Sequence, residues 1–216
     1  MNNTTPNQIS FAIGIPTVNQ GDRLKSTLQK YQQDFPSTSI FIIDNGNQNI
    51  QSENNIISQR PMPDYIRLSV AASWNVLCNI IFQSHTHAFI LNDDVLYEKG
   101  FNTIIHTIQT YLADFYVSQG GFHSFILPRE TYQKIGGFDE NFKGAYFEDR
   151  DYERRLKIAK MHTHRSLFLE PLVYETSASI KKDPCLNKHY SDNAEYYRQK
   201  WGGNQGGETF ITPFGK

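Results

Sequence analysis

The stretch Ala88-Phe89-Ile90-Leu91-Asn92-Asp93-Asp94-Val95 decides the fold, because apolar residues run directly into an amide and two carboxylates. This pattern is typical of a strand that is buried on both faces and ends at a polar site. In open α/β sheets, ligands bind at the carboxyl ends of the strands. Neighbouring carboxylates repel each other, so a buried pair at Asp93 and Asp94 favours a bound cation, and oxygen ligands suit Mg²⁺ or Mn²⁺. The alternative is an Asn-Asp turn that caps the next helix.

The composition predicts one domain with a substantial core. The chain has 216 residues, of which 38% are hydrophobic, and a chain of this size buries roughly 70% of its unfolded surface. The formal net charge of −1 argues against nucleic acid as a partner. Residues 1–8 are predicted to form a disordered tail, and no apolar run approaches the ~20 residues of a membrane span. The two cysteines, Cys78 and Cys185, favour a cytoplasmic setting over a disulfide framework or a cysteine-based zinc site.

The first half of the domain, residues 9–113, alternates strands and helices in the manner of a nucleotide-binding unit. Strands over residues 9–15 and 40–43 flank a helical pattern that begins at Gly21, and the second strand runs into Asp44. The polar stretch that follows, residues 47–64, is interpreted as a loop. Further helices are expected over residues 71–82 and 101–112.

The second half, residues 114–216, has shorter elements. Strands are expected over residues 115–117, 122–127, 167–169 and 172–174, and helices from Glu148 onward and over 192–200. The elements of the first half predict a doubly wound α/β unit of roughly the size of one nucleotide-binding unit, and both halves together, residues 9–216, are expected to form a single domain.

Several common catalytic motifs do not occur in the sequence. It has no Gly-x-Gly-x-x-Gly after the first strand and no Walker loop, which argues against a dinucleotide oxidoreductase or an ATPase. It also has no Gly-x-Ser-x-Gly elbow of a hydrolase. Acidic residues instead stand at the predicted ends of strands and at the start of a helix, so we expect a site that works with carboxylates.

Six short motifs follow one another in an order that resembles family 2 glycosyltransferases of the GT-A fold, of the bacterial and viral type. The motifs are Pro16-Thr17-x-Asn19, Ile43-Asp44-Asn45-Gly46, Ala72-Ser73-Trp74-Asn75, Leu91-Asn92-Asp93-Asp94, Ile135-Gly136-Gly137-Phe138-Asp139-Glu140-x-Phe142 and Phe147-Glu148-Asp149. The resemblance extends from about Phe11 to the end of the chain, where Lys200-Trp201-Gly202-Gly203 also fits. It implies an α/β protein of the GT-A fold, with a single Rossmann-like mixed central sheet flanked by helices.

The resemblance implies an inverting hexosyltransferase. Its donor would be a nucleotide-diphosphate sugar, with a UDP-sugar favoured, its cofactor a divalent metal, Mn²⁺ or Mg²⁺, and its acceptor a glycan or glycoprotein. Asp94, at the end of the family's Asp-x-Asp position, would bind the metal, which offsets the charge on the leaving diphosphate. The residues that would bind the donor are Thr17, Asn19, Asp44, Asn75, Asn92 and Asp93.

The same resemblance makes Asp149 the general base, with Glu148 beside it. A carboxylate at a helix N-terminus is expected to stay ionised near neutral pH, so it can accept the proton of the acceptor hydroxyl. The alternative is that both acids only complement the helix dipole and pair with arginines one turn later, as Asp151 and Arg155 are expected to do.

Two departures from the family pattern leave other functions open. Asn92 replaces the first aspartate of the Asp-x-Asp motif, and the metal-binding histidine that many relatives carry late in the fold is absent, with Glu175 or His189 as candidate replacements. A catalytically degenerate domain that binds sugar nucleotides is therefore the second hypothesis. A nucleotidyltransferase, the third, would need a Gly-rich basic loop after the first strand, where Pro16-Thr17-Val18-Asn19 stands instead.

Overall fold

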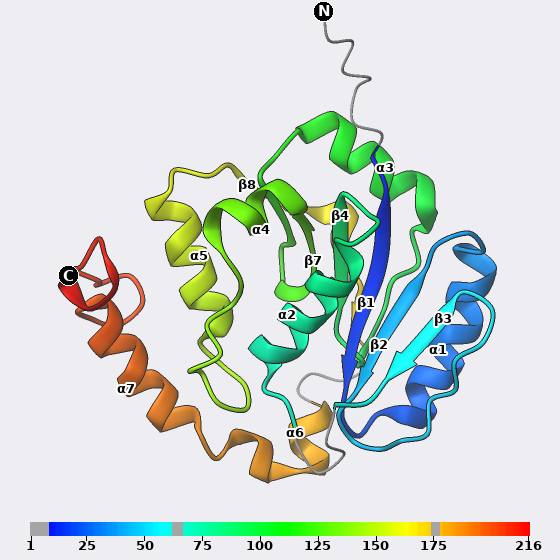
Figure 1. Cartoon of the computed structure of the whole chain (residues 1–216), viewed down its shortest axis with the longest axis horizontal. Coiled ribbons are helices and arrows are strands. Elements are labelled where there is room, and N and C mark those ends of the chain that lie inside the picture. Colours follow the sequence, from blue (N-terminus) through cyan, green and yellow to red (C-terminus); the bar gives the residue numbers. More distant parts are fainter. Residues whose placement is uncertain (1–8, 62–66, 174–177) are drawn as a thin grey trace, which may run out of the picture.

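The centre of the molecule is a mixed β-sheet. The computed structural model describes residues 9–61, 67–173 and 178–216, and within them seven strands are ordered β3-β2-β1-β4-β7-β6-β8 (Figure 1). Strand β7 runs antiparallel to β4 and β6, and the other neighbours are parallel. The strands are β1 (Phe11–Thr17), β2 (Ile40–Asp44), β3 (Ile56–Gln59), β4 (His87–Leu91), β6 (Phe115–Ser118), β7 (Gly121–Pro128) and β8 (Thr163–Ser166). The predicted mixed central sheet is confirmed.

Helices cover both faces of this sheet, because β1 carries apolar side chains on both sides. Ile13 packs with residues of α1 and α3 in one buried cluster, whereas Ala12 packs with residues of α2 and α5 in a second. The helices are α1 (Gly21–Asp34), α2 (Val70–Ile81), α3 (Gly100–Tyr111), α4 (Arg129–Ile135), α5 (Glu148–Ile158), α6 (Ala178–Lys182) and α7 (Tyr190–Trp201). No helix in the described ranges is long and apolar enough to cross a membrane.

Two of the expected elements differ in the structure. Residues 47–64 were expected to be a loop, but Ile56–Gln59 forms the edge strand β3, in which Ile56 is buried, Ser58 is half-buried, and Ile57 and Gln59 are exposed. Leu167–Leu169 was expected to be a strand, but it forms a 3₁₀ turn, η1, because the Ser166 side chain accepts a hydrogen bond from the Phe168 N–H. The strand predicted over 172–174 is the short β9 (Leu172–Val173), paired with β5 (Val95–Leu96). Residues 1–8 and Glu175 lie outside the described ranges.

The C-terminal helix α7 is fastened to α5 by a buried ion pair. Asp151 is 0% exposed and accepts hydrogen bonds from Arg155 Nε at 2.9 Å and from the indole Nε1 of Trp201 at 2.9 Å. Lys200 Nζ lies 2.6 Å from the same carboxylate and 2.6 Å from that of Asp139. These contacts give Asp151 a structural role and confirm its predicted pairing with Arg155.

The register of the parallel strands brings polar residues to one edge of the sheet. Thr17 at the end of β1 lies opposite Asp44 at the end of β2, and β4 ends beside them. Beyond β4, the Asn92 N–H donates to the His123 carbonyl of the antiparallel neighbour β7 at 3.0 Å. The fold therefore places Thr17, Asn92, Asp93 and Asp94 close to one another.

Candidate functional site

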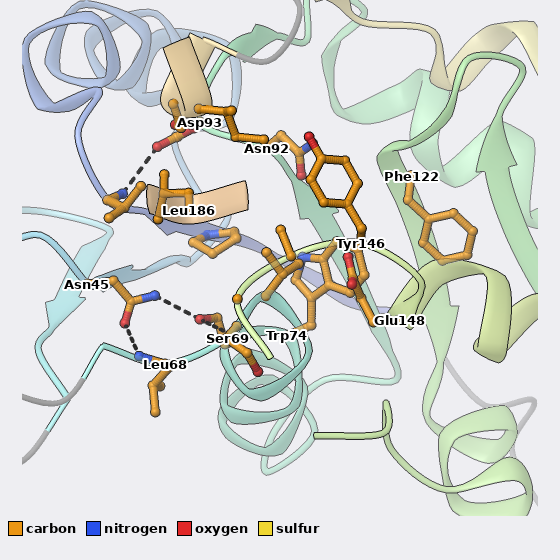
Figure 2. Close-up of a pocket in the computed structure, with 18 of the residues that line it drawn as sticks. Asn45, Leu68, Ser69, Trp74, Asn92, Asp93, Phe122, Tyr146, Glu148 and Leu186 are labelled. Atoms are coloured by element: carbon orange, nitrogen blue, oxygen red, sulfur yellow. Dashed lines mark hydrogen bonds between the residues drawn. The ribbon is translucent and has the colours of Figure 1, made fainter. Parts of the chain in front are cut away.

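A cavity of about 560 Å³ opens at this edge of the sheet (Figure 2). Its walls come from the ends of β1 and β4, the start of β7, the first turns of α2 and α5, and the segment that includes α6 and the 3₁₀ turn η2 (Pro184–Asn187). The predicted site residues among its lining are Thr17, Asn92, Asp93, Asp94, Glu148 and Asp149. The structure thus brings together two pairs of adjacent acids that lie far apart in the sequence.

Asp93, in the first acid pair, is hydrogen-bonded to neighbouring segments of the protein. Its carboxylate accepts a hydrogen bond from the Val18 N–H at 3.4 Å and one from the Ser179 hydroxyl at 3.5 Å. Burial raises the pKa of Asp93 to about 6, and the neighbouring charge of Asp94 adds to the rise, while hydrogen bonds from Thr17 and Val18 oppose it. Asp93 therefore links β1, β4 and α6 at the cavity.

Asp94, the other member of this pair, accepts a backbone hydrogen bond from Ala178 but keeps one carboxylate oxygen unpaired among the described residues. Its Oδ1 is buried and has no hydrogen-bond partner among the described residues. Burial also raises the pKa of Asp94, although the nearby His123 lowers it in part. A buried carboxylate oxygen without a partner destabilises the protein unless something else pairs with it, so this atom fits a role as a ligand for a cation.

The cation would be held by few protein ligands. Within the ranges that the structure describes, no three His, Cys, Asp or Glu side chains form a metal-binding group. His189 lines the cavity, but its Nδ1 lies 3.6 Å from the Asp192 carboxylate. Magnesium-type ions are commonly bound by one or two carboxylates together with substrate phosphates and water. The residues present fit that arrangement, with Asp94 as the protein ligand.

The second acid pair begins α5. The helix starts after Phe147, whose backbone is left-handed, so that Glu148 and Asp149 in the first turn line the cavity. Glu148 is only 6% exposed, and burial, aided by the charge of Asp149, raises its pKa to about 8. Burial raises the pKa of Asp149 as well, opposed by the Arg150 N–H and the Arg150 charge. At Glu148 desolvation therefore outweighs the backbone hydrogen bond and the Arg150 charge, which favour the ionised form. That Asp149 stays ionised near neutral pH remains a prediction.

The raised pKa of Glu148 predicts a pH-dependent stability. Between pH 4.5 and about 8 the folded protein holds a proton at Glu148 that the unfolded chain has released. The free energy of unfolding should therefore fall as the pH rises through this range, by at most about 1.4 kcal/mol per pH unit from this group. Denaturant unfolding of Glu148→Gln across the range should show a shallower fall. The exposed Glu130 in the first turn of α4 offers a control, Glu130→Gln, and an equal slope in all three proteins would contradict this account.

Two of the residues predicted to bind the donor, Asp44 and Asn19, make hydrogen bonds next to the cavity but do not line it. The Asp44 carboxylate accepts hydrogen bonds from the N–H groups of Gly46 at 3.1 Å and Gln48 at 2.8 Å. The Gln48 amide also donates to Thr17 Oγ1 at 2.9 Å, so Asp44 shapes the turn that supports Thr17. The Asn19 amide donates to the Ser179 carbonyl at 2.8 Å and ties the turn after β1 to α6. Neither Asp44 nor Asn19 is part of the cavity lining.

Asn75 has a packing role in the structure. Its amide accepts a hydrogen bond from the Phe138 N–H at 2.7 Å and donates to the Phe138 carbonyl at 2.9 Å and to Glu140 Oε1 at 2.8 Å. The side chain is buried and lies outside the cavity lining. We therefore leave Asn75 out of the proposed donor site, because its polar atoms already fasten α2 to the loop before α5.

This role predicts a loss of stability on substitution. Asn75→Ala would leave the buried polar groups of Phe138 unpaired, and we expect the free energy of unfolding to fall by roughly 1–3 kcal/mol. Asn79 lies one turn later on α2 and accepts an exposed hydrogen bond from the Tyr132 hydroxyl, so Asn79→Ala should change the free energy of unfolding by less than about 0.5 kcal/mol. Urea unfolding compares the two variants. A stable Asn75→Ala protein with weakened nucleotide binding would instead favour the role predicted from the sequence.

The cavity also contains residues that the sequence did not identify as site residues. Asn45 lines it and connects two segments, accepting from the Leu68 N–H at 3.2 Å and donating to the Ser73 hydroxyl at 2.8 Å. His123 lines it beside Asp94. Asn45 belongs to the motif Ile43-Asp44-Asn45-Gly46, so the sequence could have indicated it. His123 is brought to the site by the antiparallel pairing of β7 with β4.

Comparisons with known proteins support the fold. No family model and no curated protein matches the sequence. Among solved structures, the chain is similar to GalNAc-T7 crystallised with UDP, GalNAc and Mn²⁺, with a TM-score of 0.56 and 10% identity over 91% of this chain and 51% of that one. It is also similar to 4-diphosphocytidyl-2C-methyl-D-erythritol synthase from Anaerococcus prevotii, with a TM-score of 0.51 and 8% identity over 83% of this chain and 99% of that one.

These likenesses show the fold. The chain has a GT-A-like α/β fold with a mixed central sheet, as predicted, and it spans about half the length of the GalNAc-T7 chain.

Proposed function

We propose that this chain is an inverting, metal-dependent glycosyltransferase, a hexosyltransferase that uses a nucleotide-diphosphate sugar, with UDP-sugars the favoured donors and a glycan or glycoconjugate as acceptor. One observation carries the proposal: Asp93 and Asp94 share a single cavity with Glu148 and Asp149, at the carboxyl ends of β1 and β4. The motifs that resemble family 2 glycosyltransferases support it. The Mn²⁺ and UDP in the GalNAc-T7 crystal are in keeping with it.

The roles of the residues follow from their positions. Thr17 and Asn45 would line the nucleotide part of the cavity, and Asp94 would hold a divalent metal against the diphosphate. When bound, such an ion offsets the negative charge that grows on the leaving nucleoside diphosphate. Asp93 would keep β1 and α6 in place around the donor through its hydrogen bonds to Val18 and Ser179.

The second acid pair, Glu148 and Asp149, would supply the base that accepts the proton of the acceptor hydroxyl. As the acceptor oxygen bonds to the anomeric carbon and the bond from that carbon to the phosphate oxygen breaks, Asp149 would take the proton of the acceptor hydroxyl. Glu148, with its pKa of about 8, would be protonated at pH 7. Two adjacent acids with different protonation states are a common way for one site to hold both a base and a neutral acid.

A thermal-shift panel tests the proposal. UDP, GDP, dTDP and CMP would each be added with and without Mn²⁺. A ligand at 100 times its dissociation constant adds about 2.7 kcal/mol to the free energy of unfolding, which corresponds to a rise in Tm on the order of 5–10 °C. We expect a metal-dependent rise with a nucleoside diphosphate, UDP first. No rise with any of them would remove the donor site on which the proposal depends.

A further inference from the structure

Trp74, a residue that lines the cavity, has a buried indole N–H without an acceptor among the described residues. Trp74 lies on α2, is 2% exposed and lines the cavity, and its Nε1 has no hydrogen-bond partner among the described residues. The other tryptophan of the chain, Trp201, donates its Nε1 proton to Asp151 at 2.9 Å. Buried tryptophans usually have such a partner, so the Trp74 N–H, which has none in the described part of the chain, is a donor that a ligand in the cavity could pair with.

Packing alone does not require an indole at this position. The ring of Trp74 contacts Phe138 and Phe125 at centroid distances of 4.9 and 5.1 Å and stacks on Phe122 at 5.8 Å. A phenylalanine would make most of these apolar contacts without burying an unpaired polar group, which destabilises a folded protein. The indole therefore suits a position that donates a hydrogen bond to a ligand.

The surroundings of Trp74 indicate what kind of ligand fits. Phe122, Tyr146 and Glu148 also line the cavity, and in Figure 2 the Tyr146 ring extends toward Asn92. Tyr146 and Phe147 both have positive φ angles, 80° and 75°, in a backbone conformation that bulky residues rarely adopt. Such strain is typical of functional sites, and here it brings Tyr146 and Glu148 to the cavity. We call Trp74, Phe122 and Tyr146 the aromatic wall.

We propose that the aromatic wall is the sugar subsite, in which Trp74 Nε1 donates a hydrogen bond to an oxygen of a sugar ring held beside Glu148 and Asp149. A sugar ring has apolar C–H faces that pack on aromatic rings, and hydroxyl oxygens that accept from an N–H. The inference rests on the proposed function and deepens it. It makes Trp74 a specificity residue whose indole N–H contacts the sugar and not the nucleotide.

The test separates the sugar from the nucleotide. Calorimetric titrations with Mn²⁺ present would compare wild type and Trp74→Phe, which keeps an aromatic ring but lacks the N–H. The first series uses UDP, UDP-glucose, UDP-galactose and UDP-GlcNAc; the second adds the methyl glycosides of the same sugars to protein saturated with UDP. Trp201→Phe is the matched control, because it removes the other indole N–H, which lies with α7 and α5 outside the cavity lining.

In Trp74→Phe the dissociation constant of UDP should stay within about twofold of wild type, whereas sugar binding should weaken by about tenfold, the effect of one lost hydrogen bond. A loss in the first series would assign the contact to the donor sugar, and a loss in the second to the acceptor. Trp201→Phe should show neither loss. The sugar subsite would be overturned if wild type and Trp74→Phe bound the sugars equally well. It would also be overturned if wild type bound UDP and the sugar added nothing detectable to the affinity. Either result would leave the proposed function standing. Failure of wild type to bind any nucleoside diphosphate in the thermal-shift panel would overturn both.

Discussion

Asp149→Asn should lower the rate of sugar transfer by about 10²–10⁴-fold, the usual contribution of a general base. The Asp149 side chain lines the cavity at the start of α5, and among the described residues its carboxylate accepts a local hydrogen bond, from the N–H of Arg150 at 2.8 Å. An amide of nearly the same shape keeps this contact possible but cannot take a proton from the acceptor. The dissociation constant of the nucleoside diphosphate should therefore change by less than about twofold.

A matched control distinguishes catalysis from helix stabilisation. Glu130 also lies in the first turn of a helix, α4, but it is exposed and outside the cavity lining. If Asp149 only complements the helix dipole, Asp149→Asn and Glu130→Gln should both cost a few tenths of a kcal/mol in stability and leave turnover intact. Retained turnover in Asp149→Asn would thus rule out the general-base assignment.

Asp94→Asn should remove most of the metal-dependent part of nucleotide binding. Asp94 Oδ1 is buried and unpartnered in the described part of the chain, and it is the carboxylate oxygen best placed to accept a cation. We expect the dissociation constant of UDP in Mn²⁺ to rise roughly 10- to 100-fold, the size of loss that substitutions around metal sites commonly produce. In EDTA, wild type and variant should bind UDP with similar, weaker affinity.

The stability of Asp94→Asn provides a second readout. Because burial raises the pKa of Asp94, the folded state disfavours its charge, so an uncharged amide should leave the metal-free protein at least as stable as wild type. The same UDP affinity in wild type and variant with Mn²⁺ would contradict the assignment of Asp94 as the metal ligand.

The sequence was sufficient to predict an α/β fold, because the apolar run that ends at Leu91 and the βαβ pattern before it indicate buried strands separated by helices. The mixed character of the sheet was predicted from the resemblance to family 2 glycosyltransferases. The sequence also located both acid pairs that line the cavity, since each stands where a strand ends or a helix begins. The edge strand β3 was missed because Ile56-Ile57-Ser58-Gln59 is short and half polar, which is the composition of a loop as much as of an edge.

Contacts between distant segments could not be predicted in the same way. Asn75 stands in a motif that resembles a donor-binding one, but its hydrogen-bond partners at Phe138 and Glu140 lie more than sixty residues away. His123 reaches the cavity through the register of an antiparallel pair, which hydrophobic periodicity does not fix. The raised pKa of Glu148 depends on burial by the assembled fold, whereas its position at a helix N-terminus alone suggests an ionised acid.

The most direct test of the central claim is to follow the reaction itself by NMR. The protein would be incubated with Mn²⁺, each UDP-sugar and a set of methyl glycosides, and samples taken at early times would be freed of metal with EDTA. We predict release of UDP from at least one donor, with the α-linked sugar of that donor appearing as a β-linked product. A product that keeps the α configuration would contradict inversion. A parallel incubation would contain UTP and a sugar 1-phosphate. If a UDP-sugar and pyrophosphate form there, and no UDP-sugar donates its sugar, the protein is a nucleotidyltransferase and the account is contradicted.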